Sequence, residues 1–162
     1  GEPLYFSPLD EAARAGIREA FHKLTGVPHG HSQELHVKGR TLIIPEAAQG
    51  VALFTFAELC GRPLGPNDYL AIARNFHTVI IEGVPVLSRA RRDEARRFNT
   101  LIDTLYDQGT GLIVSAEVEP DALYTEGDGA DLFQRTASRL MEMRSESYLM
   151  TARHKRQARP DA

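Results

Sequence analysis

The stretch His77-Thr78-Val79-Ile80-Ile81-Glu82-Gly83 and the later stretch Gly111-Leu112-Ile113-Val114-Ser115-Ala116 decide the fold of this chain. Each is a short aliphatic, largely β-branched run, which is typical of a strand that is buried on both faces. Between them, residues 89–107 carry apolar side chains on one helical face and charges on the other, and Gly109 ends this helix. Two strands joined through a helix predict a parallel βαβ unit with a right-handed crossover.

The segments around this unit predict one α/β domain over residues 1–149, in which a partly parallel sheet is flanked by helices. The domain opens with a helix over 7–26. Ser7 is the expected N-cap, Pro8 takes the first helical position and Gly26 ends the helix.

A small β-hairpin is expected next, because two strand patterns flank Lys38-Gly39-Arg40 within a hairpin and strand region over 34–56. Asn67 is the expected cap of a further helix, which opens a region over 67–143 that holds the βαβ unit and ends in an arginine-bearing helix. Residues 150–162 are basic and predict a flexible tail.

Composition excludes several classes of protein. The chain has 162 residues, a mass of 18.0 kDa and a formal net charge of −3, so attraction of the whole molecule to nucleic acid is not expected. No run approaches the roughly 18 apolar residues that a membrane span needs. A single cysteine, Cys60, leaves no internal disulfide and fits a reducing compartment. We therefore expect a cytoplasmic protein with no nucleic-acid partner and no membrane span.

Independent catalysis is not expected, because each local motif is incomplete. Residues 60–66 contain two glycines but no following Lys-Ser/Thr pair, and their prolines remove amide donors that a phosphate loop needs. Glu82 ends a hydrophobic strand but is followed by Gly83 rather than by a second acid. His29 and His31 have no cysteine or carboxylate cluster beside them, so no metal site is predicted. Cys60 has no local histidine and is expected to be a buried apolar residue.

The sharper signal is a pair of arginines on the last helix. Arg135 and Arg139 lie four residues apart and so project from one helix face, while apolar residues occupy the opposite face. Two parallel guanidinium groups suit a γ-phosphate or a partner's carboxylate. The alternative is a surface pair between Arg139 and Glu142, which would be worth only tenths of a kcal/mol. Spacing alone leaves both interpretations open.

Several segments together resemble the ZapE-like AAA+ ATPase family. They span roughly residues 4–149, and those that carry the resemblance are Phe56-Ala57-Glu58-Leu59-Cys60, Pro63-Leu64-Gly65, Asp68-Tyr69-Leu70, Phe76-His77-Thr78, Val84-Pro85, Ala95-Arg96-Arg97-Phe98, Leu101-Ile102-Asp103, Leu105-Tyr106-Asp107 and Arg135-Thr136-Ala137-Ser138-Arg139-Leu140. The resemblance implies the C-terminal part of such an ATPase, with a degenerate AAA+/RecA-like core that lacks the phosphate-binding P-loop.

The resemblance also implies roles for individual residues. Arg139 would be an arginine finger that reaches the γ-phosphate held by a neighbouring subunit, and Arg135 would support it. Ser138, within the same motif, and Ser115, at the place of a sensor residue, are weaker candidates for contact with nucleotide. No metal ligand is implied on this chain.

The implied cofactors are ATP and magnesium in the full-length parent, with none expected on this chain alone. The implied partners are the N-terminal P-loop half of the same protein and neighbouring subunits of a homo-oligomer, in the bacterial cytoplasm. The chain would then be inactive alone and would support ATP hydrolysis by that half. The alternative function is an interaction module that recruits clients, such as cell division or protein quality-control proteins.

Overall fold

A computed structural model describes residues 3–124, 130–145 and 147–151. The strands are β1 (Tyr5–Phe6), β2 (His31–Val37), β3 (Arg40–Ala48), β4 (Val51–Thr55), β5 (Thr78–Val84) and β6 (Gly111–Ala116). The helices are α1 (Glu11–Thr25), α2 (Phe56–Cys60), α3 (Pro66–Asn75), α4 (Arg92–Gln108) and α5 (Ala130–Met143), with short 3-10 turns at Arg89–Arg91 and Pro120–Ala122.

The strands form one six-stranded sheet in the order β1-β6-β5-β4-β3-β2. β5 and β6 run parallel with Thr78 opposite Gly111, and they are joined through α4, so the predicted βαβ unit is confirmed. β4 is parallel to β5 and β1 is parallel to β6, whereas β3 and β2 are antiparallel to their neighbours. The predicted α/β fold class, with a partly parallel sheet and a hairpin, is also confirmed.

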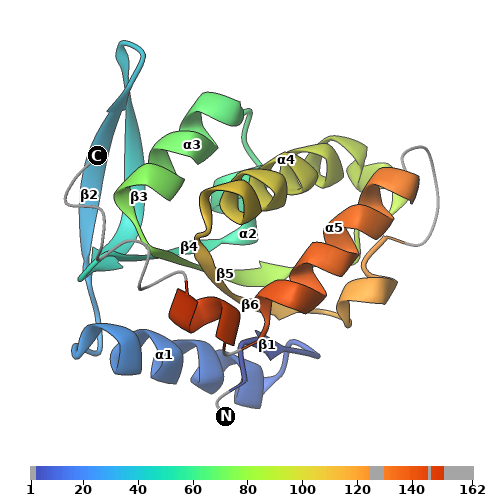
Figure 1. Cartoon of the computed structure of the whole chain (residues 1–162), viewed down its shortest axis with the longest axis horizontal. Coiled ribbons are helices and arrows are strands. Elements are labelled where there is room, and N and C mark those ends of the chain that lie inside the picture. Colours follow the sequence, from blue (N-terminus) through green and yellow to red (C-terminus); the bar gives the residue numbers. More distant parts are fainter. Residues whose placement is uncertain (1–2, 125–129, 146, 152–162) are drawn as a thin grey trace.

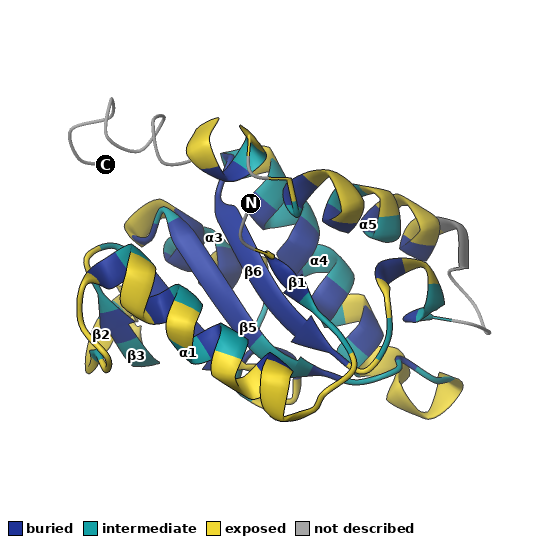
Figure 2. Cartoon of the chain, turned by 90° about the horizontal axis from the view of Figure 1, so that it is seen from below, coloured by how far each residue is buried: buried dark blue, intermediate teal, exposed yellow. Residues whose placement is uncertain are grey.

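Helices cover both faces of the sheet, with α2, α3, α4 and α5 on one face and α1 on the other (Figure 1). Successive residues of β5 accordingly enter different cores: Val79 and Ile81 lie in the cluster under α4, and Ile80 lies in the cluster under α1. This alternation is the period of a strand that is buried on both sides. Figure 2 shows β6 buried along its length and β5 buried over most of its length, with the outer side of α1 exposed.

Two helices begin at residues other than those that the sequence pattern indicated. α1 starts at Glu11 because the carboxylate of Asp10 accepts a hydrogen bond from the backbone N–H of Ala13 at 2.9 Å. Ser7, the expected N-cap, instead donates its hydroxyl to Glu119. α3 starts at Pro66, so the predicted cap Asn67 lies in its first turn. The predicted end of α1 at Gly26 is confirmed, with a left-handed φ of 80°.

The hairpin turn is a two-residue turn, shorter than the predicted Lys38-Gly39-Arg40. Lys38 and Gly39 have φ values of 47° and 81°, and Arg40 already pairs with Val37 in the ladder. Two successive positive φ values match the right-handed twist of the flanking strands. Arg40 also forms an ion pair with the buried Asp68, which ties the hairpin to α3.

The C-terminal segment packs onto the domain. Residues 147–151 form a helical turn beside α1 (Figure 1), where Leu149 is buried in the cluster under that helix. Of the predicted tail over 150–162, residues 152–162 lie outside the described residues. Among the residues that the structure does describe, no helix has the length and apolar character that crossing a membrane requires.

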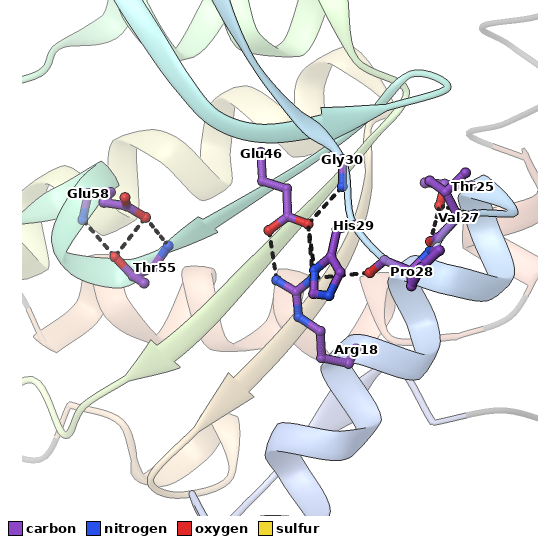
Figure 3. Close-up of polar contacts among 9 residues, drawn as sticks. All are labelled: Arg18, Thr25, Val27, Pro28, His29, Gly30, Glu46, Thr55 and Glu58. Atoms are coloured by element: carbon purple, nitrogen blue, oxygen red, sulfur yellow. Dashed lines mark hydrogen bonds and ion pairs between the residues drawn. The ribbon is translucent and has the colours of Figure 1, made fainter.

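An ion pair joins α1 to β3 (Figure 3). Nη1 and Nη2 of Arg18 donate to the two carboxylate oxygens of Glu46, at 2.9 and 2.7 Å. The backbone N–H of Gly30 donates to the same carboxylate at 3.0 Å, and His29 lies 3.9 Å from it. The hydrogen bonds from Arg18 are the main cause that lowers the pKa of Glu46 from 4.5 to about 2.

Glu46→Gln is expected to lower the free energy of unfolding by about 1–3 kcal/mol, because Arg18 and Gly30 would lose a charged acceptor. The folded-state pKa lies below the unfolded value, so the carboxylate stabilises the fold above pH about 4.5 and loses this effect as the pH falls toward 2. Urea denaturation should therefore show a gap between wild type and variant at neutral pH that narrows in acid. A gap of constant size would contradict the prediction. Glu19→Gln, on the exposed side of α1, is the control.

Candidate functional site

The arginine-bearing helix α5 packs against α4 on the outside of the domain. Its buried side chains follow helical spacing and are Phe133, Thr136, Leu140 and Met143. Arg135 and Arg139 lie beside this buried face and point toward α4, but their side chains are exposed to different extents. The side chain of Arg135 is 52% exposed, whereas that of Arg139 is 23% exposed.

Both arginines bind one carboxylate, that of Asp103 on α4. Nη2 of Arg135 donates to Oδ2 of Asp103 at 3.1 Å, and Nη1 of Arg139 donates to Oδ1. Glu142, the partner considered for Arg139 from spacing, instead accepts hydrogen bonds from the hydroxyl of Tyr106 at 3.0 and 3.1 Å. The arginine pair is therefore a link between two helices as well as a surface feature.

Tyr106 and Tyr148 complete the cluster. The guanidinium carbon of Arg139 lies 4.7 Å above the centre of the Tyr106 ring, within the range of a cation–π contact. The Tyr106 ring stacks on that of Tyr148 at 6.3 Å between centroids. The hydrogen bond to Glu142 raises the pKa of Tyr106, and burial raises the pKa of Tyr148 to about 12. Both phenols are thus protonated donors at neutral pH.

Sequence reasoning missed Asp103 and Tyr106 as members of this site. They lie three residues apart on α4, and so share a helix face, but they are 36 and 33 residues from Arg139 in the chain. The sequence did offer one sign of them: an acid and a tyrosine lie next to the apolar residues Leu101, Ile102 and Leu105, which are buried. Nothing in the spacing of α5 alone could have found the partner helix.

The two serine candidates lie in different places. Ser138 is exposed on α5, between the arginines in sequence. Ser115 is 1% exposed on β6, and its hydroxyl accepts a hydrogen bond from the backbone N–H of Gly83 at 2.9 Å. It shares the sheet face of Ile113, which packs under α1, so the sheet separates Ser115 from the arginine pair.

Ser115 lines a hollow of about 280 Å³ at the carboxyl ends of β5 and β6, together with Glu82 and residues of the first turns of α1. Ligands of parallel α/β sheets bind at this edge. Here, however, the carboxylate of Asp10 already occupies the helix N-terminus, and Glu82 adds a second acid. Both acids repel phosphate. Arg14 also lines the hollow, but it pairs with Glu11 at 3.6 Å, so the hollow as a whole is not well suited to a nucleotide.

Metal and thiol chemistry gain no support from the geometry. Within the described part of the chain, no cluster of three or more His, Cys, Asp or Glu side chains could hold a metal ion. Cys60 is fully buried, and its burial raises the pKa of the thiol to about 12, which leaves it protonated and unreactive at neutral pH.

Comparison with known proteins identifies the family. The model of the family described as AFG1-like ATPase matches residues 1–152. The chain belongs to the AFG1-like ATPase family. The resemblance to ZapE-like ATPases, which rested on short motifs, is thereby confirmed.

Two relatives of this AFG1-like chain show how much of the family protein it spans. It is 38% identical over 147 residues to the cell division protein ZapE of Escherichia coli, covering 90% of this chain and 39% of that protein. It is also 38% identical over 179 residues to lactation elevated protein 1 homolog B of Danio rerio, covering 90% and 36%. The chain thus spans about two fifths of the length of these relatives. No solved structure matches it with significance.

Arg139→Ala is expected to lower the free energy of unfolding by about 1–3 kcal/mol, because it removes an ion pair and the packing on Tyr106 in a partly buried setting. Arg135→Ala, at a more exposed pair, is expected to cost about 0–1 kcal/mol. Urea denaturation of the two variants measures the difference. Arg96→Ala, a surface arginine on α4, is the control. Equal losses for Arg135 and Arg139 would show that the contact with Tyr106 adds nothing.

Proposed function

We propose that this chain is the C-terminal domain of an AFG1-like ATPase and supports ATP hydrolysis by the P-loop half of the same protein. The observation that carries the proposal is the arginine pair, Arg135 and Arg139, held side by side on α5 by Asp103. In a member of an ATPase family, such a pair is suited to bind a phosphate that another domain or subunit holds.

The physical contribution would be charge stabilisation. Phosphoryl transfer spreads negative charge over the transferred group, and an arginine finger that meets this charge accelerates GTPases by about 10³–10⁵-fold. An arginine that is already held in place costs no reorganisation at the moment of reaction. ATP and magnesium would be held by the P-loop half, and this chain alone would not turn over ATP.

The setting of the site favours a donor that acts on a neighbouring subunit. α5 lies on the outside of this domain, and the hollow at the carboxyl ends of its own strands does not suit a phosphate. A homo-oligomer in the cytoplasm would bring the arginine pair of one subunit to the ATP of the next. Arg139 and Arg135 are then the catalytic candidates, and the exposed Ser138 is the serine that lies beside them.

A second function, recruitment of client proteins, is favoured by a separate feature. An apolar groove of about 640 Å³ lies on the α1 side of the sheet, on the opposite face from α5. It is lined by Leu4, Phe6, Ile113, Leu149 and the adjoining side of α1. The E. coli relative is named for cell division. On this alternative, apolar segments of division or quality-control proteins would bind here, and ATP turnover would not depend on α5.

Steady-state ATP turnover by the full-length protein tests the proposal. Replacing both Arg135 and Arg139 by Ala is expected to lower kcat by at least about 100-fold, the cost of losing a charged donor to the transition state, with little change in ATP affinity. Arg96→Ala should leave kcat unchanged.

Client recruitment makes the opposite prediction. The double arginine variant would then keep wild-type turnover, while Ala15→Asp, at an exposed position in the groove, would abolish partner binding. The urea midpoint of each variant checks that a loss of function is not a loss of fold.

A further inference from the structure

We infer that the two arginines have different roles, with Arg135 as the donor to the phosphate and Asp103 as the residue that positions it, while Arg139 anchors the cluster. This inference rests on the proposed function and deepens it, since it concerns which side chain touches the phosphate. It reverses the order implied by the family resemblance, in which Arg139 reaches out and Arg135 supports.

Arg139 is held on two sides. One side of its guanidinium pairs with Asp103, and its face lies 4.7 Å above the ring of Tyr106. That ring is itself fixed, by a stack on Tyr148 and by the hydrogen bonds from its hydroxyl to Glu142. Reaching a second subunit would require Arg139 to break the ion pair and leave the ring together. Its 23% exposure fits an anchoring role.

Among the described residues, Arg135 has one carboxylate partner, and more than half of its side chain is exposed. Its Nη2 donates to Asp103 at 3.1 Å, and the side chain is 52% exposed. A guanidinium carries five N–H donors in a planar fork, so several donors of Arg135 remain for an incoming group. The hydrogen bond from Nη2 to Asp103 fixes the direction of the guanidinium group, and the remaining N–H donors can bind two phosphate oxygens.

Asp103 is the element that both arginines share. Each of its carboxylate oxygens binds a different guanidinium. α4 holds the carboxylate in place, because the neighbouring Leu101, Ile102 and Leu105 are fully buried against the core. Removing the charge of Asp103 would therefore free both arginines without removing either. Its effect on turnover would act through Arg135, which makes Asp103 a positioning residue.

Steady-state kinetics of the full-length protein separate these roles. Arg135→Lys keeps the charge but loses the fork, and should lower kcat by about 100-fold, as for loss of one transition-state donor. Asp103→Asn should lower kcat by about 10–100-fold, as for a misplaced catalytic group. KM for ATP should stay within about twofold, because ATP is bound by the other half. Asp103→Glu, which keeps the carboxylate, should retain most of the wild-type kcat. Asp107→Asn, one turn further along α4, should leave kcat unchanged.

Three results would overturn the inference. The first is a larger loss of kcat in Arg139→Lys than in Arg135→Lys when both variants keep the wild-type urea midpoint. The second is wild-type turnover in Asp103→Asn. The third is an increase of kcat in Asp103→Asn, which would make Asp103 a restraint.

If the double arginine variant is inactive while Arg135→Lys and Asp103→Asn retain turnover, this inference alone fails. If the double variant is fully active, the proposed function itself fails.

Discussion

Burial of the two central parallel strands on both faces is the constraint on which the rest of this structure depends. The middle residues of β5 and β6, 79–81 and 112–114, are apolar and buried at successive positions, so neither face of these strands can be left to water. α1 covers one face, and α4, which the crossover places beside the strands it connects, covers much of the other. α5 then packs on α4. The position of Asp103 and Tyr106 along the junction of these helices is thus a consequence of how the sheet is covered.

The sequence was sufficient where a signal is local. The strand–helix–strand pattern, the hairpin and the end of α1 at Gly26 are set by side-chain period and by residues that tolerate left-handed backbone. Helix starts were less well predicted, because Ser7 and Asp10 both suit an N-cap and only tertiary contacts decide between them. Ser7 is drawn away by Glu119, more than one hundred residues further along the chain.

The candidate site shows the same division. Spacing on one helix brought Arg135 and Arg139 together, and this was right. It could not give their partner, because Asp103 belongs to another helix and meets them only through packing. Nor could it show that Ser115 faces α1, on the other side of the sheet from the arginines. The segments that carry the family resemblance include Asp103 and Tyr106 on α4, but the resemblance did not indicate which residues these two contact.

The last described turn connects the hydrophobic layers on the two sides of the sheet. α5 contributes Leu140 and Met143 to the core under α4, and only a few residues later Leu149 enters the core under α1. The chain thereby joins the two hydrophobic layers around the amino-terminal end of β6, where the Tyr148 hydroxyl donates to the backbone oxygen of Thr110. Loss of this one turn would therefore uncover part of the layer under α1, although the turn follows closely on the helix that packs over the other face.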